Sequence, residues 1–214
     1  MDDRADWDIG TVDTWFADRD LYDTEDPGFG RYTADTQTLD SVLYDHPTVL
    51  SVWSAGNDRN NSFTNANGES QYVTWLSSTG ASGPGWYLVE TADYPAPPSD
   101  GNGGTGYDSL SGDQNAKNTL VVGSVLDYTT DPHVDGDGSI TTNSFSSYGS
   151  TDDGRMKPDV VGNGNALYSS LAGSDSSYGV YSGTSMAAPN VTGTVALLVE
   201  HYRDLNSDSD PTSA

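Results

Sequence analysis

Ser185 is the residue whose neighbours are best suited to chemistry. It lies in the run Tyr181–Pro189, where a glycine comes just before the hydroxyl-bearing residues and small residues follow. A serine at the start of a helix is most often a cap for the first backbone N–H groups. Small neighbours, however, let another backbone approach the hydroxyl, and a helix N-terminus stabilises nearby negative charge. We therefore treat Ser185 as a candidate nucleophile for a carbonyl carbon.

Asn57 is the second candidate. It ends the segment Ser54–Asn57, which directly follows the apolar run Thr48–Trp53. An asparagine beside a glycine is by itself most often a turn residue. Its side-chain amide is also a donor of the kind that stabilises a developing oxyanion. With Ser185 downstream, we favour the oxyanion interpretation.

A serine hydroxyl is a weak nucleophile until a base takes its proton, so a histidine is needed. The chain has three. His46 precedes the run Thr48–Trp53 and is expected in a loop. His133 lies in a loop rich in aspartate and glycine, and His201 lies near the end of a predicted helix. We expect the last two at the surface, so none of the three is predicted to be the base.

Short apolar runs separated by Gly, Ser, Thr, Asn and Asp predict an α/β fold in one domain. The runs are Thr48–Trp53, Trp86–Val89, Thr119–Val125 and Pro158–Val161. The first and third are short, β-branched and nearly continuous. This pattern is typical of parallel strands buried between helices.

Two stretches predict helices. Thr33–Tyr44 places apolar residues and Thr36 at helical spacing just before the first strand. A second helix from about Ser185 to about Leu205 is predicted because apolar residues recur there at intervals of four and three. These are Val191, Val195, Leu198, Tyr202 and Leu205. Pro189 is compatible with this helix only in the first turn, so the helix should begin very near Ser185.

The segment Gly183–Pro189 resembles the nucleophile motif of the subtilisin-like serine peptidases, the subtilases. Further segments match that family in the same order, so the resemblance covers about residues 22–202. They are Ser54–Asn57, Ala116–Gly123, Phe145–Gly149 and Asp152–Val161. The resemblance implies an α/β fold with a mainly parallel sheet flanked by helices.

The resemblance also implies a serine endopeptidase. Ser185 would attack the peptide carbonyl, and the Ser185 backbone N–H and the Asn57 side-chain amide would hold the oxyanion. The substrate-binding residues that it implies are Ser54, Ala55, Gly56, Gly183 and Thr184. A peptide or protein is the expected substrate. No cofactor is required for this chemistry, although family members often bind structural calcium.

The family places an aspartate and a histidine before the oxyanion asparagine, and neither is identified here. The run Asp8–Thr11 follows no apolar strand, so we interpret it as an exposed acidic terminus. We expect a chain that begins inside the fold, with a poorly ordered acidic segment over 1–20, a partial peptidase domain over 21–205 and a tail or linker over 206–214. Its expected partner is a missing N-terminal half that carries the aspartate and histidine, and the isolated chain should have little activity.

The charge and composition exclude several classes of protein. Eight Lys and Arg against 32 Asp and Glu give a net charge of −24 over 214 residues, which repels nucleic acid and anionic membranes. The absence of Cys excludes disulfides, thiolate metal sites and a cysteine nucleophile. No apolar run approaches the roughly 18 residues of a membrane span, and no signal peptide is visible. An extracellular location is implied by the resemblance only.

The acidity also favours a halophilic host. At about 1 M salt the Debye length falls to ~3 Å, and self-repulsion on this scale becomes tolerable. We expect the chain to lose structure on dialysis into dilute buffer. Circular dichroism before and after dialysis measures this, and an unchanged spectrum would contradict it. The alternative is an ordinary soluble acidic surface.

Two other functions remain open from the sequence. A non-catalytic subtilase relative could bind peptides in the same cleft without cutting them. An acidic secreted module that binds carbohydrate or calcium is suggested by 13 Tyr, five Trp and the aspartate–glycine loops. The segment Asp135–Ile140 resembles the middle of a calcium loop, but His133 occupies the first ligand position and no Glu closes the loop. No metal-ligating residue is predicted.

Overall fold

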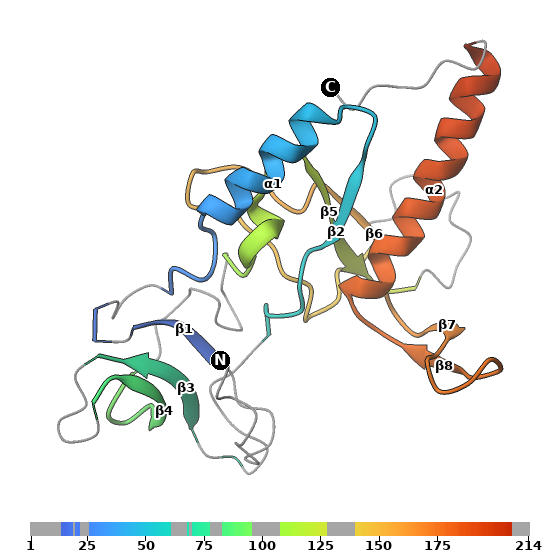
Figure 1. Ribbon diagram of the computed structural model, residues 1–214. Helices are drawn as coiled ribbons and strands as arrows, with labels where there is room; N and C mark the ends of the chain where they lie inside the picture. Colours follow the sequence, from blue (N-terminus) through green and yellow to red (C-terminus); the bar gives the residue numbers. More distant parts are fainter. Residues whose placement is uncertain are drawn as a thin grey trace.

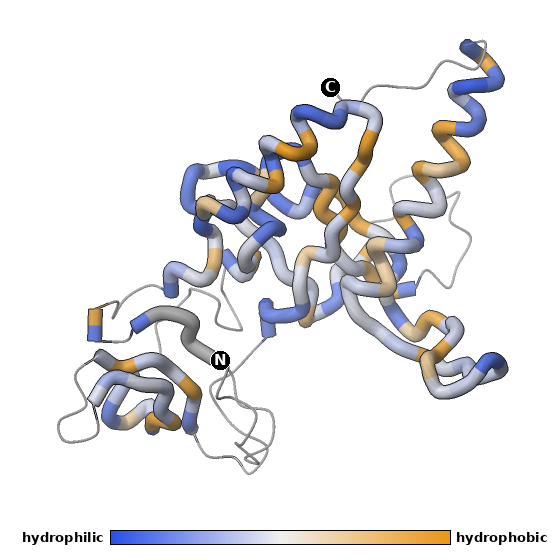
Figure 2. Tube along the Cα trace, viewed as in Figure 1, coloured by the Kyte–Doolittle hydropathy of each residue, from blue (hydrophilic) through white to orange (hydrophobic). Residues whose placement is uncertain are grey.

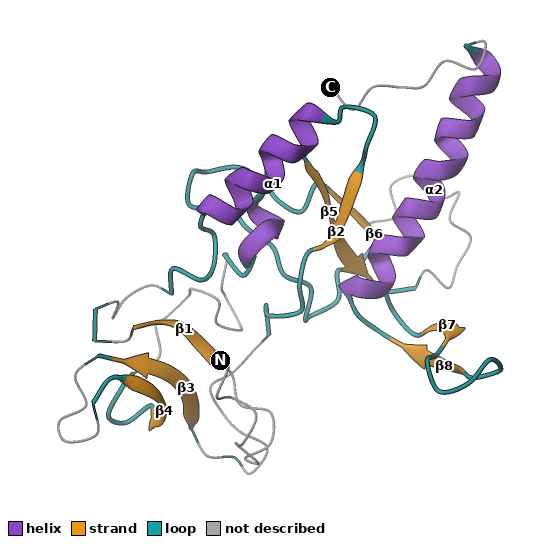
Figure 3. Ribbon diagram, viewed as in Figure 1, coloured by secondary structure: helices purple, strands orange, loops and turns teal. Residues whose placement is uncertain are grey.

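The computed structural model describes most of the chain, and the described part contains two α-helices and three small sheets. Figure 1 and Figure 3 show their arrangement. The described residues are 14–18, 20–21, 26–60, 68, 70–77, 83–95, 108–127 and 140–206. Three sequence predictions lie outside them: the exposed terminus at Asp8–Thr11, the loop around His133, and the tail from 207 onward. The acidic segment over 1–20 is described mainly at strand β1, Thr14–Asp18.

The central sheet has the order β2–β5–β6, and all of its strands are parallel. Strand β2 is Ser51–Ser54, β5 is Thr119–Val125 and β6 is Val160–Asn163. Val121 and Val122 in the middle strand are fully buried. Hydrophobic residues gather along this sheet (Figure 2). The predicted parallel α/β arrangement is confirmed.

Two helices flank the central sheet, and both were predicted. Helix α1 is Ala34–Asp45, and it begins where the Thr33 hydroxyl accepts the Thr36 backbone N–H at 3.3 Å. Helix α2 is Thr184–Leu205 and contacts all three strands of the sheet. In Figure 1 the sheet lies between the two helices. Within the described residues, no helix is long and apolar enough to cross a membrane.

Pro189 does not lie in the first turn of α2, so that prediction is wrong. The helix begins at Thr184, which places Pro189 in the second turn. Proline cannot donate the hydrogen bond to the carbonyl four residues earlier, which belongs to Ser185. Because Ser185 is exposed, water can reach this carbonyl. The predicted start of the helix is nevertheless correct to within one residue.

The apolar face predicted for α2 is buried only in its first half. Val191 and Val195 are half-buried, whereas Leu198, Tyr202 and Leu205 are exposed. Figure 1 shows the C-terminal half of the helix projecting beyond the central sheet. Helical spacing therefore identified the helix, but the sheet is too small to cover its whole face. Tyr44, at the end of the predicted helix Thr33–Tyr44, is exposed.

A second sheet has the order β1–β3–β4. In the sequence, β3 and β4 come between Asn57 and β5, whereas β1 comes before α1. Strand β3 is Gln71–Leu76 and β4 is Gly85–Glu90, paired antiparallel. The apolar run Trp86–Val89 lies within β4. This sheet has its own core of Tyr72, Leu76 and Val89. The third sheet is the hairpin of β7, Leu167–Ser170, and β8, Tyr178–Tyr181, which leads into α2.

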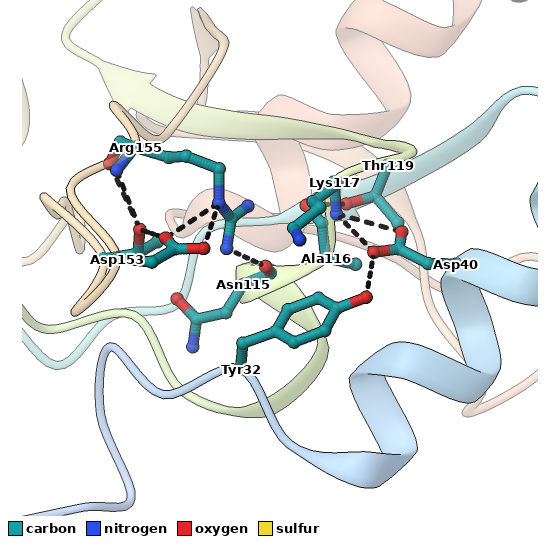
Figure 4. Close-up of polar contacts among 9 residues, drawn as sticks. Tyr32, Asp40, Asn115, Ala116, Lys117, Thr119, Asp153 and Arg155 are labelled. Carbon is teal, nitrogen blue, oxygen red and sulfur yellow. Dashed lines mark hydrogen bonds and ion pairs between the residues drawn. The ribbon is translucent and has the colours of Figure 1, made fainter.

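A polar cluster joins α1 to the segment before β5 (Figure 4). The buried Asp40 carboxylate accepts the backbone N–H groups of Lys117 and Asn118 at 2.8 to 3.0 Å and the Tyr32 hydroxyl at 2.7 Å. Burial raises the pKa of Asp40, but these hydrogen bonds outweigh it and hold the pKa below the ordinary value of an aspartate. The Asp40 bond also raises the pKa of Tyr32. The carboxylate is thus held in its charged form.

The folded chain should lose stability in acid through Asp40. A group whose pKa is lower in the folded state stabilises the fold above its unfolded pKa of about 4, and this contribution is lost as the pH falls through the folded pKa. The Asp40→Asn variant should be less stable by about 1.5–3 kcal/mol near neutral pH, because it loses hydrogen bonds to a charged group. Melting temperatures between pH 7 and pH 2 should therefore fall more steeply for the unmodified chain. Parallel curves would contradict the assignment.

Candidate active site

The start of α2 meets the end of β2 through two hydrogen bonds to one side chain. The Asn57 Oδ1 accepts both the Thr184 backbone N–H and the Thr184 hydroxyl, each at 3.0 Å, across 127 residues of sequence. The Thr184 hydroxyl oxygen in turn accepts the Gly56 backbone N–H at 3.2 Å. Both candidate chemical residues, Asn57 and Ser185, are therefore brought to one place. The side chain of Thr184 is buried between them.

These contacts leave the donor end of Asn57 available. The Asn57 Oδ1 is occupied by Thr184, and the amide nitrogen Nδ2 lies 3.5 Å from the position that a Cβ on Gly183 would take. Asn57 is exposed. Among the described residues, Nδ2 has no hydrogen-bond partner. A fixed amide with free N–H groups can donate to an incoming oxygen atom.

Ser185 is not the cap of α2. Gly183 is the N-cap residue, and Ser185 is the second residue of the helix. Its side chain is exposed, and no partner in the described part of the chain takes up either its hydroxyl or its backbone N–H. The hydroxyl therefore lies in the first helical turn, where free N–H groups and the helix dipole favour negative charge.

The predicted substrate-binding residues surround the same place. Ser54 ends β2 and is half-buried, Ala55 is fully buried, and Gly56 has φ +97°, a conformation that favours glycine. Gly183 and Thr184 are buried at the start of α2. Their contact with a substrate stays a prediction. What sequence reasoning missed is that Thr184 holds Asn57, because the motif itself gives no sign of a partner 127 residues away.

A glycine-to-glycine contact supports the segment that leads to Ser185. The Gly183 backbone N–H donates to the Gly164 carbonyl at 2.8 Å. A Cβ on Gly164 would lie 2.5 Å from the Gly183 carbonyl oxygen and 2.2 Å from the hydroxyl of the buried Ser124. Real side chains do not approach this closely. Gly164 is therefore required for the close approach of the two backbones.

The Gly164→Ala variant should be destabilised by about 1–3 kcal/mol, the usual cost of forcing an extra carbon into a packed site. Gly193 is a matched control, because it lies inside α2 and a Cβ there would meet nothing within 4 Å. Gly193→Ala should stabilise the fold by about 1 kcal/mol through helix propensity. Chemical denaturation of both variants measures the difference. Equal effects of the two substitutions would show that the contact is not tight.

The two described histidines are not placed to act on Ser185. His46 is the C-cap of α1, where its backbone N–H donates to the Leu43 carbonyl, and it is exposed. His201 is an exposed residue of the last turns of α2. His46 was predicted in a loop and directly follows α1, and His201 was predicted at the surface and is exposed. Both predictions are confirmed. No hydrogen bond in the described ranges links either of them to Ser185.

The described residues contain no group of three or more His, Cys, Asp or Glu side chains that could hold a metal ion. The calcium-like segment Asp135–Ile140 lies outside them except for Ile140. Structural calcium therefore stays a prediction without named ligands.

Comparison with known proteins shows which family and which individual proteins this chain is similar to. The model of the subtilase family of peptidases matches residues 16–209. C5a peptidase of Streptococcus pyogenes is 43% identical over 68 residues, which are 32% of this chain and 6% of that protein. Pyrolysin of Pyrococcus furiosus is 51% identical over 55 residues, 26% of this chain and 4% of that protein. The matched segments thus cover less than a tenth of the length of these curated relatives.

Among solved structures, the CspB protease of Clostridium perfringens shares 29% sequence identity, with a TM-score of 0.38 over 48% of this chain and 20% of that chain. The family model, by contrast, covers nearly the whole sequence, including both Asn57 and Ser185. On this match, the chain belongs to the subtilase family of peptidases.

Proposed function

We propose that this chain is the nucleophile-bearing portion of a serine endopeptidase that hydrolyses peptide bonds. The observation that carries the proposal is the double hydrogen bond from Thr184 to the Asn57 Oδ1. It sets the free Nδ2 of Asn57 beside the first turn of α2, where the Ser185 hydroxyl is exposed. The relatives named as peptidases and the family match support the same activity.

In this proposal Ser185 attacks the carbonyl carbon of a bound peptide. The carbonyl oxygen then gains negative charge, and two donors receive it: the Asn57 Nδ2 and the Ser185 backbone N–H. Both have no competing partner within the described structure. Donors fixed before the reaction act on the transition state without reorganising, which is the largest single contribution in many acyl-transfer enzymes. Ser54, Ala55 and Gly56 would form one wall of the pocket for the substrate side chain.

The general base and its aspartate come, in this proposal, from polypeptide outside the described residues. Without them Ser185 keeps little nucleophilic drive. Subtilisins that lack triad members retain about 10³–10⁴ over water from the oxyanion hole and binding. We expect activity of that order for the isolated chain, and an extracellular, salt-rich setting for the whole protein.

A fluorophosphonate probe tests the proposal, because its phosphoryl oxygen occupies the same donors as an oxyanion. We expect slow labelling at a single residue, Ser185, identified by mass spectrometry, and none in Ser185→Ala. Labelling that is unchanged in Ser185→Ala would refute the assignment of the nucleophile. Labelling at the rate of an intact peptidase would show that the chain already contains its base.

A second candidate function is peptide binding without cleavage, since neither described histidine, His46 or His201, is hydrogen-bonded to Ser185. The same experiment separates the two. A binder would take up peptide, measured by calorimetry, while Ser185 stayed unlabelled even when the upstream polypeptide is supplied.

A further inference from the structure

Ser147 is a buried residue that contacts both peptide groups next to Asn57. Its backbone N–H donates to the Gly56 carbonyl at 3.0 Å. Its hydroxyl oxygen accepts the Asp58 backbone N–H at 2.9 Å. The first of these groups precedes Asn57 in the chain and the second follows it. One serine, 89 residues away from Asp58, thus holds the backbone on either side of Asn57.

Ser147 is itself held firmly. Its side chain is fully buried. The next residue, Tyr148, exchanges hydrogen bonds with Ser109, whose N–H donates to the Tyr148 carbonyl and whose hydroxyl accepts the Tyr148 N–H, both at 3.1 Å. The close approach to Gly56 depends on the absence of a side chain there, because a Cβ on Gly56 would lie 3.1 Å from the Ser147 hydroxyl oxygen.

The side chain and the backbone of Asn57 are therefore held by different partners. Thr184 occupies the Oδ1 of Asn57, and Ser147 occupies the two flanking peptide groups. On the side chain of Asn57, the Nδ2 group has no partner in the described part of the chain. The direction of Nδ2 is then set by the backbone as much as by the side-chain rotamer. A misplacement of about 1 Å in a catalytic group can cost about 10²-fold in rate.

We propose that Ser147 is a positioning residue for the Asn57 amide, acting through the backbone hydrogen bonds at Gly56 and Asp58. This inference rests on the proposed function of Asn57 as an oxyanion donor. Ser147 touches neither substrate nor Ser185 in this role. Its effect on the reaction passes entirely through Asn57, and that is the property an experiment can isolate.

Ser146 offers a matched control in the same loop. It is also a buried serine, but its hydroxyl accepts the Ser124 backbone N–H at 2.9 Å, in strand β5. Ser146→Ala and Ser147→Ala each remove one buried hydroxyl acceptor of a backbone N–H. They differ in whether that N–H flanks Asn57.

The first test is a double-mutant cycle on the rate at which fluorophosphonate labels Ser185. We expect Ser147→Ala to label about tenfold more slowly than the unmodified chain, and the addition of Ser147→Ala to Asn57→Ala to cause no further loss. Ser146→Ala should change the labelling rate by the same factor in the unmodified chain and in the Asn57→Ala variant. If Ser147→Ala slows labelling equally in the Asn57→Ala background, Ser147 is a structural residue only.

The second test does not depend on the reaction. The side-chain ¹⁵N order parameter of Asn57 reports how firmly Nδ2 is held. It should fall in Ser147→Ala and stay unchanged in Ser146→Ala. A value unchanged in Ser147→Ala overturns the proposal. If Ser185 is never labelled but the order parameter falls as expected, the proposed peptidase function fails and the positioning of Asn57 stands.

Ser147→Cys extends both tests should Ser147→Ala unfold. A thiol keeps a group at the hydroxyl position, although it is larger than a hydroxyl, and it accepts hydrogen bonds only weakly. This variant should lie between the unmodified chain and Ser147→Ala in labelling rate and order parameter. Values equal to those of the unmodified chain would contradict a role for the hydroxyl.

Discussion

Asp159→Ala should destabilise the fold by about 3 kcal/mol, the cost of leaving a buried charge without its partner. The Lys157 side chain is only 4% exposed, and its ammonium donates to the Asp159 carboxylate at 2.7 Å and to the Thr119 carbonyl at 2.9 Å. The same Asp159 oxygen accepts the Val121 backbone N–H at 2.7 Å. Removing the carboxylate therefore strands a cation and a backbone donor next to the central strand.

The control is removal of the cation as well. Lys157→Met replaces the ammonium with an apolar side chain of similar length, and such replacements of buried charges are often neutral. The double variant with Asp159→Ala should thus be more stable than Asp159→Ala alone, as measured by urea denaturation at fixed salt. If the two are equally unstable, the stranded ammonium is not the cause, and the lost Val121 hydrogen bond is the main contribution.

Asn57→Ala should slow the capture of Ser185 by a fluorophosphonate about 10²–10³-fold, which corresponds to roughly 2.7–4 kcal/mol. This magnitude is the one measured for the oxyanion asparagine of a subtilisin. The physical reason is that Thr184 holds the Asn57 amide in place before the reaction. A water molecule that took its place in the variant would not be oriented in the same way. The rate is measured under single-turnover conditions with excess probe.

A stability control accompanies this prediction. Asn206 caps the far end of α2, where its side chain donates to the Tyr202 carbonyl at 2.8 Å. Like Asn57→Ala, Asn206→Ala removes an asparagine side chain that is hydrogen-bonded to α2. Asn206, however, lies at the opposite end of the helix from Ser185. It should leave the labelling rate unchanged. A similar loss in both variants would mean that the rate reports helix stability rather than oxyanion binding.

The sequence predicts the parts of the fold whose signal is local. The run Thr119–Val125 is continuous and β-branched, and β5 has the same bounds. Helices α1 and α2 follow from apolar spacing. Strand β3 was missed because Gln71–Leu76 alternates little, with Tyr72, Val73 and Thr74 all buried. The exposure of the second half of α2 was missed because spacing identifies a face but not what covers it.

The same division applies to the site. Asn57 and Ser185 were proposed as site residues because Ser185 lies in a short, specific motif, which also favoured the oxyanion interpretation of Asn57. The bonds that orient Asn57 were not, because Thr184 and Ser147 reach it from 127 and 90 residues away. No pattern within one segment records such pairs. They exist only when β2, β5 and α2 have packed and brought three loops to one end of the sheet.

The distance along the chain between Asn57 and Thr184 also sets an order of events during synthesis. Ribosomes add about 5–20 residues per second, so some 6–25 s pass between the two residues. During that time the nascent chain holds Asn57 without the partner that binds its side-chain oxygen. The arrangement of Asn57 against the start of α2 can therefore form only after the 127 residues that separate it from Thr184 have been added.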